Sequence, residues 1–233
     1  MHGVAGRSLR WWERSVLQRQ SLKTARPMDD ATTLTDSDKR YLLRLARDTI
    51  EAVVRSKPRP RVVESELSES LLRPADTFVT LFLRGQLRGC IGSRSGREPL
   101  YRSVMDSAEA SATRDPRFPP VAAWEVPELE ISVSVLTPTR PIQWSTVNDL
   151  RERIQPFVHG VVLSNGVRRA LYLPQVWEHF AGDPDAHAAF LSSLSRKAGD
   201  PTGTLWKDPG TRYEIFEAET FRESDYETST RRR

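Results

Sequence analysis

The stretch "TFVTLFLRGQLRGCIGS", residues 77–93, decides how this chain folds. Two runs of strand-forming residues flank Gly85, a residue suited to a tight turn. We therefore predict a β-hairpin at this position. Its second strand carries Cys90, the single cysteine of the chain, inside the sequence RGCIG. The hairpin presents one thiol among arginines and glycines, and the role of that thiol is the main functional question.

A second hairpin is predicted in "HGVVLSNGVRRALYL", residues 159–173, because an Asn-Gly pair separates its two apolar runs. Each hairpin is followed by a helical pattern, over residues 99–113 after the first and 185–199 after the second. Lys197 lies in the last turn of the second helix, where a cation offsets the helix dipole. Strand, turn, strand and helix therefore occur twice, which indicates a duplicated unit.

Three further elements complete the predicted fold. The segment "ELEISVSVL", residues 128–136, alternates as a strand with one buried face does, and "TRYEIFEAETF", residues 211–221, supplies a late strand. Thr35 caps a helix that extends to Val54. Because the strands arrive as adjacent hairpins, we predict an α+β fold: a curved, mostly antiparallel, barrel-like sheet with helices packed outside, built from a duplicated strand-hairpin-helix unit.

Composition and charge predict one globular domain with extensions. The chain has 233 residues, 28% charged and 38% hydrophobic, enough to bury a full core. Residues 1–27 hold six basic residues and one acidic residue, a net charge of +5, so the +4 of the whole chain leaves −1 for the rest. We predict a basic, disordered leader over 1–33, a domain over 34–223 and a disordered tail over 224–233. A targeting peptide, a surface-binding helix and a nucleic-acid arm remain alternatives for the leader.

Several functional classes are not expected from the sequence. One cysteine cannot form an internal disulfide or supply a closed zinc or iron–sulfur site, which favours a reducing compartment. We find no apolar run long enough to span a bilayer and no secretory signal core. Phosphate-binding loops, HExxH and CxxxCxxC motifs and an RNA-binding signature are also missing. We therefore predict a cytoplasmic protein without a bound metal or cofactor, without a membrane partner and without a nucleic-acid partner.

Six motifs in order resemble a known family: "LRGCIGS", "SATRDPRFPPV", "PELEISVSVLTP", "GVVLSNG", "LYLPQV" and "RKAGDP…W". They are similar to the AMMECR-domain family, whose prokaryotic members are called AmmeMemoRadiSam system protein A, from about Leu34 to about Phe221. The resemblance implies an α+β fold with a duplicated unit around a barrel-like sheet. It also implies a pathway or partnership shared with a Memo-like protein and a radical SAM enzyme. It assigns no reaction, so an accessory or binding protein is expected and enzymatic activity stays open.

Two interpretations of the Cys90 motif remain open from the sequence. In the first, Arg88 and Arg94 favour a thiolate nucleophile, and Gly89 and Gly92 bare amide N–H groups that hold an anion or oxyanion. In the second, Cys90 is a small buried residue, the glycines permit close packing and the arginines point to water. The first predicts a thiol-dependent enzyme acting on an anionic small substrate, and the second predicts a structural motif.

The loop "TRDPRFPPV", residues 113–121, is the second candidate element. Its prolines make it stiff, so Arg114 and Arg117 could present guanidinium groups to a phosphate or carboxylate, whereas Asp115 could brace the loop. If the loop lies beside Cys90, the two form a cleft for an anionic small molecule. Cys90 is the candidate catalytic residue. The predicted ligand-binding set is Arg88, Gly89, Cys90, Gly92, Arg114, Asp115 and Arg117, with Glu130 as a polar cleft residue and general-base candidate.

Overall fold

The computed structural model describes residues 33–93 and 96–226. The described residues from Leu34 onward belong to one compact unit, and the description below concerns that unit. The predicted disorder of the leader and the position of Arg94 lie outside the described residues. The predicted tail begins inside a short 3₁₀ helix, Glu223–Asp225, and residues 227–233 are not described.

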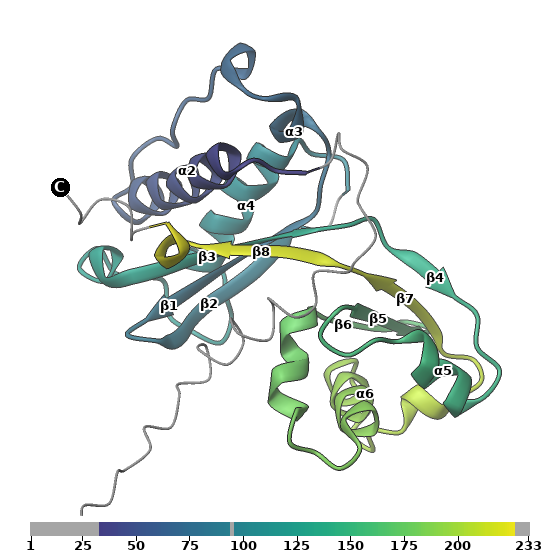
Figure 1. The fold of residues 1–233 in the computed structure, drawn as a ribbon. Helices are drawn as coiled ribbons and strands as arrows, with labels where there is room; N and C mark the ends of the chain where they lie inside the picture. The colour runs from purple at the N-terminus through teal and green to yellow at the C-terminus, as the bar shows by residue number, and fades with distance from the viewer. Residues whose placement is uncertain (1–32, 94–95, 227–233) are drawn as a thin grey trace, which may run out of the picture. The chain divides into compact units, whose positions relative to one another are not determined.

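The first half of this unit is a four-stranded antiparallel sheet covered on one face by helices (Figure 1). Its strand order is β2-β1-β3-β8. The strands are β1 (Thr77–Leu83), β2 (Gln86–Ser93), β3 (Leu129–Leu136) and β8 (Ala218–Arg222), and the helices are α2 (Asp36–Val54), α3 (Glu69–Leu72) and α4 (Leu100–Thr113). The predicted turn between β1 and β2 has φ of 52° at Arg84 and 78° at Gly85, as a two-residue hairpin turn of type I′ requires.

The second half repeats this plan with a second antiparallel sheet of order β4-β7-β5-β6. Its strands are β4 (Arg140–Ile142), β5 (Gly160–Asn165), β6 (Arg168–Tyr172) and β7 (Arg212–Phe216). Its helices are α5 (Val147–Arg153) and α6 (Ala186–Lys197), and a 3₁₀ helix (Pro174–Phe180) connects β6 to α6. The predicted turn is present, with Gly166 at φ 57°.

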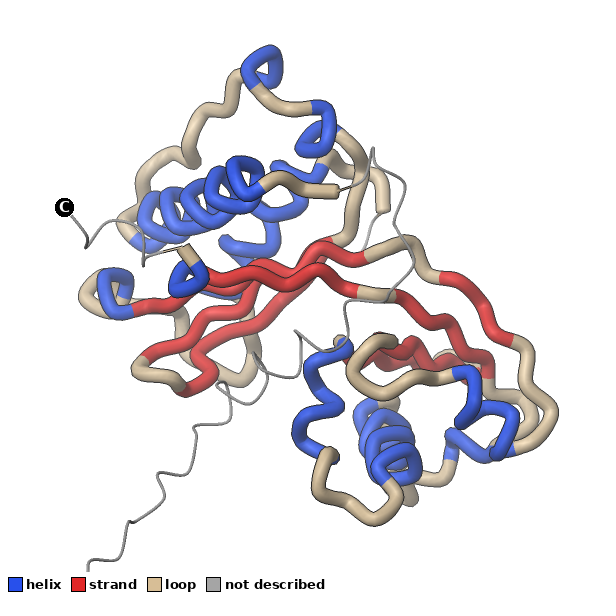
Figure 2. Tube along the Cα trace, in the orientation of Figure 1, coloured by secondary structure: helices blue, strands red, loops and turns tan. Residues whose placement is uncertain are grey.

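The two repeats exchange their last strands, β4 and β8. The series β1-β2-α4-β3 matches β5-β6-α6-β7, but β4, which follows β3, pairs with β7, and β8, which follows β7, pairs with β3. Figure 2 shows these segments running from one sheet into the other. The α+β class and the antiparallel pairing are confirmed. In the described residues the strands are divided between two four-stranded sheets, and neither closes into a barrel.

The first core lies on one face of the first sheet, and the opposite face carries polar side chains together with Phe78 and Phe82. A capping box starts α2, with Thr35 N donating to Asp38 Oδ2 at 2.9 Å and Asp38 N donating to Thr35 Oγ1 at 3.1 Å. The apolar residues of α2 and α4 then pack on one face of β1 and β3, which presents Val79, Leu81, Ile131 and Val133. Because side chains alternate along a strand, the residues between them lie on the opposite face. That face is where the cysteine lies.

The second core is dominated by aromatic rings. Trp177 and Phe190 stack with ring centres 3.7 Å apart, and both are fully buried. Ser195 accepts a hydrogen bond from Trp206 N at 3.0 Å and donates to Leu191 O at 2.8 Å. This serine is therefore a structural residue of the second core. Among the described residues, no helix is long and apolar enough to cross a membrane, and no three His, Cys, Asp or Glu side chains gather as metal ligands would.

Candidate functional site

Cys90 lies on the polar face of the first sheet. It is directly opposite Thr80 of β1, and Thr80 is directly opposite Ser132 of β3. Directly opposed residues of antiparallel strands share a face, so the three side chains form a row across the sheet. Thr80 Oγ1 donates to Cys90 Sγ at 3.2 Å. The row lies on the face opposite α2 and α4.

The loop of residues 113–121 does lie beside Cys90. Cys90 N donates to Asp115 Oδ2 at 2.8 Å, and Arg117 Nη2 donates to Cys90 O at 3.3 Å. Arg117 also forms an ion pair with Asp115, with Nη2 2.6 Å from Oδ2. The Asp115 side chain is 2% exposed and that of Arg117 is 52% exposed. Asp115 thus fixes the cysteine backbone from inside the protein, while Arg117 reaches the surface next to it.

Asp115 is held ionised by this arrangement. Hydrogen bonds from the Arg117 guanidinium lower its pKa from 3.8 to about 2, helped by the amide N–H groups of Cys90 and Arg117 and opposed by burial. A depressed folded-state pKa adds stability above the unfolded-state pKa, and the added stability disappears as the pH falls through about 2.

We expect Asp115→Asn to lower the free energy of unfolding by about 2 kcal/mol at pH 7, the equivalent of this pKa shift. The difference between the two proteins should shrink between pH 4 and pH 2, because Asp115 becomes neutral in the parent chain as well. Urea unfolding at several pH values measures this difference. Asp183→Asn, at an exposed carboxylate, is the control and should change little. A difference that stays constant down to pH 2 would contradict the assigned role of the carboxylate.

The three candidate arginines have different roles. Arg88 forms a bidentate ion pair with Glu125, at 2.8 and 2.9 Å, and donates to the carbonyls of Pro119 and Pro120. The two charged side chains are 11% and 8% exposed, so Arg88 braces the loop. Arg114 is 60% exposed and pairs with a carboxylate of α4. Arg117 combines exposure with contact to Cys90 and is the arginine best placed for a ligand.

Close packing accounts for the two glycines of the motif. A Cβ on Gly89 would lie 2.3 Å from the carbonyl oxygen of Ser111, and one on Gly92 would lie 2.5 Å from the carbonyl oxygen of Thr77. The amides beside the glycines are occupied, since Cys90 N donates to Asp115 and Ile91 N donates to Ser111 Oγ at 2.8 Å. These two N–H groups therefore hold the strand in place and do not form an anion-binding backbone pocket.

Lys197 of α6 is a site residue that sequence reasoning missed. Its Nζ donates to Leu171 O at 3.0 Å and lies 4.8 Å from the centre of the Tyr172 ring. Burial of the ammonium group lowers its pKa, as does the charge of Arg117, whereas the charge of a Cys90 thiolate would raise it. The residue as a whole is exposed. Two cations thus act on one thiol.

The Cys90 thiol is neutral at neutral pH. Burial raises its pKa and the Asp115 charge adds to the rise, while the Thr80 hydroxyl and the charges of Arg117 and Lys197 oppose it. The net effect is upward, because desolvation of a thiolate outweighs two partly solvated cations. The site at rest therefore presents a thiol and two positive charges, one of which is compensated by Asp115.

The remaining candidates lie apart from the thiol. Glu130 is on β3 opposite Phe82, and its carboxylate accepts from Ser224 Oγ at 2.5 Å. His187 Nε2 donates to Ile154 O at 2.9 Å, within the second half of the fold. Neither residue is among the described groups that shift the pKa of Cys90. The charged groups with the main influence on the Cys90 pKa are Arg117, Asp115 and Lys197.

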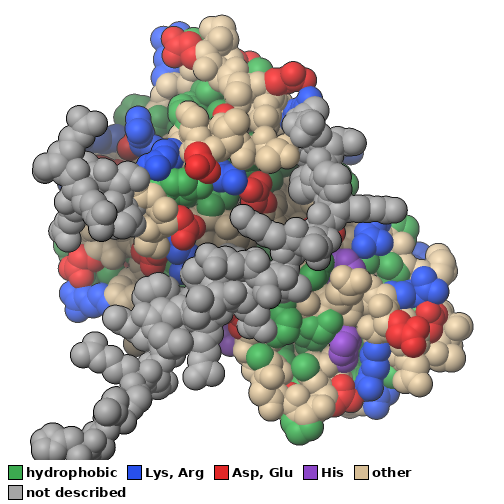
Figure 3. Space-filling view, in the orientation of Figure 1, with side chains coloured by type: hydrophobic (Ala, Val, Ile, Leu, Met, Phe, Trp, Pro, Cys, Tyr) green, Lys and Arg blue, Asp and Glu red, His purple; other side chains and the backbone are tan. Residues whose placement is uncertain are grey.

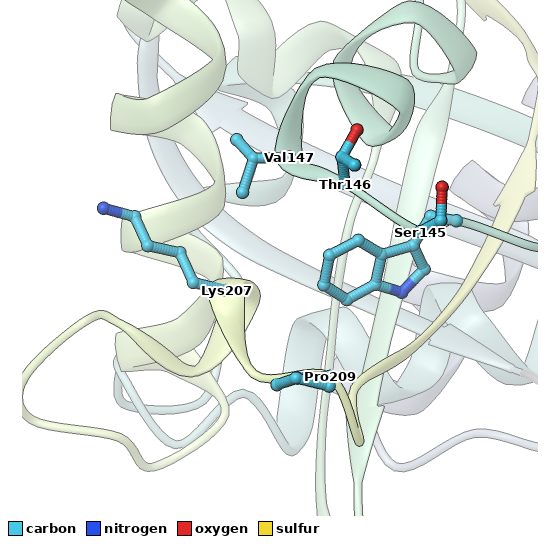
Figure 4. Close-up of a pocket in the computed structure, with 6 residues that line it drawn as sticks. Ser145, Thr146, Val147, Lys207 and Pro209 are labelled. Atoms are coloured by element: carbon cyan, nitrogen blue, oxygen red, sulfur yellow. The ribbon is translucent and has the colours of Figure 1, made fainter.

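Two surface depressions lie elsewhere. One of about 210 Å³ is lined by the turn before α5 and by the segment after α6, as Figure 4 shows. Its lining residues are Trp144, Ser145, Thr146, Val147, Lys207 and Pro209. Another of about 440 Å³ lies beside the start of α2, with Asp38 and Tyr41 in its wall. Neither contains a residue of the predicted set. On the face drawn in Figure 3, acidic and basic side chains of the described residues are interspersed.

Comparison with known proteins places the chain in a family. The AMMECR1 family model matches residues 43–221. A protein of Methanothermobacter thermautotrophicus is 35% identical over 190 residues, which cover 82% of this chain and 96% of that protein. Protein Mbar_A1807 of Methanosarcina barkeri is 36% identical, with 82% and 93% covered. The crystal structure of uncharacterized protein PH0010 from Pyrococcus horikoshii has a similar fold, with a TM-score of 0.74, 33% identity and coverage of 82% and 93%. The chain therefore belongs to the AMMECR1 family.

Proposed function

We propose that this protein is an accessory protein that binds an anionic ligand or a partner through the Cys90 site, in a pathway associated with a radical SAM enzyme and a Memo-like protein. The pathway assignment rests on family membership alone. The binding role rests on one observation: Arg117 and Lys197 come from different halves of the fold and both act on Cys90. Because Asp115 compensates one cation, the site keeps one positive charge and suits a monoanionic group.

A thiol-dependent enzyme is the second candidate, and Lys197 is the observation that favours it. The pKa of the lysine is lowered and that of Cys90 is raised, so the two values approach each other. These shifts make transfer of the thiol proton to the amine less favourable than between the free groups, but the lowered pKa of Lys197 leaves more of the amine neutral, and a neutral amine could act as the base that a nucleophilic thiol needs. The raised pKa of the resting thiol supports the binding role over this one.

Alkylation of Cys90 in the folded protein tests both candidates, since the chain has a single cysteine. We expect the reaction with iodoacetamide to have an apparent pKa above the ordinary value of about 8.5. At equal thiolate fraction, anionic iodoacetate should be favoured over neutral iodoacetamide several-fold more than with a free thiol, because two cations border the site. Lys197→Met and Arg117→Met should each reduce that preference.

The outcomes separate the two roles. A preference for iodoacetate no greater than that of a free thiol would contradict anion binding at this site. An apparent pKa of Cys90 well below the ordinary value that returns to the ordinary value in Lys197→Met would favour the thiol-dependent enzyme over the binding role. Arg114→Met is the matched control, since this arginine belongs to the same loop but is not among the groups that act on Cys90.

A further inference from the structure

The larger surface cavity, of about 440 Å³, shares no residue with the Cys90 site. It lies between the start of α2 and residues 61–71, the segment that contains the 3₁₀ helix Glu64–Glu66 and most of α3. Small-molecule sites usually have volumes of roughly 300–1,000 Å³. This cavity is therefore large enough for a small organic ligand.

The walls of the cavity are held in place by contacts within the protein. Tyr101 Oη donates to Glu64 Oε1 at 2.5 Å, and Ser68 Oγ donates to Asp38 Oδ1 at 2.6 Å. The two prolines of "KPRPR", residues 57–61, restrict the backbone that leads into the wall. Because the walls need little further ordering, less binding free energy is lost when a ligand enters.

Two opposite charges line the cavity without pairing. Arg61 and Glu66 both belong to its wall, and both are exposed. Among the described residues, neither forms an ion pair within 4.0 Å, with the other or with a third side chain. Asp38, the other carboxylate of the wall, already accepts hydrogen bonds from Thr35 and Ser68. The cavity thus offers one cation and one anion to a ligand.

The remaining lining is largely apolar, and Tyr41 adds a hydroxyl. Leu71 is 2% exposed, and Val62 and Leu67 are partly buried against the first core. The Tyr41 hydroxyl has no hydrogen-bond partner in the described part of the chain. Burial raises the pKa of Tyr41 and the charge of Glu66 adds to the rise, so the phenol is a donor at neutral pH. An apolar group therefore fits between the two charges of the wall.

We propose that this cavity binds a free α-amino acid with an aliphatic side chain, such as leucine. Arg61 pairs with the carboxylate of the ligand and Glu66 pairs with its ammonium group, while the aliphatic side chain packs on the apolar lining. A zwitterion satisfies both charges of the wall at once. A simple anion would be repelled by Glu66, and a simple cation would be repelled by Arg61. This site is independent of the function proposed for Cys90.

An NMR titration of the full-length ¹⁵N-labelled protein with L-leucine at constant ionic strength tests the proposal. We expect saturable shifts of the backbone amides in residues 37–41 and 61–71. Two analogues each remove one charge: 4-methylpentanoate lacks the ammonium group, and 3-methylbutylamine lacks the carboxylate. Each should bind roughly tenfold more weakly than leucine, because a charge-assisted hydrogen bond is lost.

Two variants assign the charges to their residues. In Glu66→Gln, leucine should bind no better than 4-methylpentanoate, and in Arg61→Gln it should bind no better than 3-methylbutylamine. Glu69→Gln and Lys57→Gln, at exposed residues outside the cavity wall, are the matched controls and should keep the preference for leucine. Three results would overturn the proposal: no saturable response to leucine, analogues that bind as tightly as leucine, or a preference that survives in both Glu66→Gln and Arg61→Gln. Because the two replaced residues are exposed, unchanged backbone spectra elsewhere will show that the variants remain folded.

Discussion

Replacing Arg88 with alanine is expected to lower the free energy of unfolding by about 3–5 kcal/mol, the usual effect of removing one partner from a buried ion pair. The replacement leaves the Glu125 carboxylate, 8% exposed, without its bidentate partner. The guanidinium lowers the pKa of Glu125, so its loss should allow that carboxyl to take up a proton at a higher pH. The carbonyls of Pro119 and Pro120 lose a donor as well. Chemical denaturation at pH 7 measures the effect.

Arg114→Ala is the control for this prediction. Arg114 lies near the start of loop 113–121, whereas Arg88 holds the end of that loop through Pro119 and Pro120. The Arg114 side chain is 60% exposed, and its ion pair with Glu109 is a surface pair. Exposed pairs contribute about 0–1 kcal/mol, so this variant should be close to the parent in stability. Equal effects of Arg88→Ala and Arg114→Ala would show that Arg88 is not the brace that the geometry indicates.

The result also bears on function. If Arg88 holds the loop, its loss will change the Cys90 site through the loop that carries Asp115 and Arg117, and not by removing a ligand contact. A change in Cys90 reactivity in Arg88→Ala would then be accompanied by a loss of stability. Arg117→Met removes the partner of the buried Asp115, so we expect it to lower both the stability and the preference of Cys90 for iodoacetate.

The local elements of the fold were predictable because their causes are local. The cap at Thr35, the turns at Gly85 and Gly166 and the alternation of residues 128–136 each depend on a few adjacent residues. The order of strands within the sheets was not predictable in the same way. The exchange of β4 and β8 depends on which apolar faces meet after the chain has turned back, and no short motif encodes that choice.

The candidate site, like the fold, was predictable only in those parts that depend on adjacent residues. Loop 113–121 and Cys90 were both candidates from the sequence, but whether they meet stayed open there, because their contact joins segments about 25 residues apart. Lys197 could not be found, because its position at the end of α6 has a sufficient local explanation in the helix dipole. Its charge influences Cys90 across the two halves of the duplication, and sequence spacing carries no information about such a long-range arrangement.

Gly89→Ala is expected to lower the free energy of unfolding by about 3 kcal/mol, at the upper end of overpacking effects. The new Cβ would lie 2.3 Å from the Ser111 carbonyl oxygen and 3.2 Å from its carbonyl carbon, both backbone atoms of α4 that no side-chain rotation can move. The clash of the new Cβ with the Ser111 backbone can be relieved only if β2 and α4 move apart. Such a separation would weaken the bond from Ile91 N to Ser111 Oγ as well. Denaturant unfolding of the two proteins at pH 7 gives the difference.

Gly182→Ala is the matched control, because a Cβ there meets no atom within 4 Å and the residue does not have a positive φ. It should have little effect. A large loss in Gly89→Ala alone would show that glycine is required next to the cysteine for close packing of strand against helix. If Gly89→Ala instead kept its stability and lost the preference of Cys90 for iodoacetate, the glycine would serve the ligand. The packing distance to Ser111 argues for the first outcome, in which the proposed anion binding rests on Arg117 and Lys197 and not on the glycine.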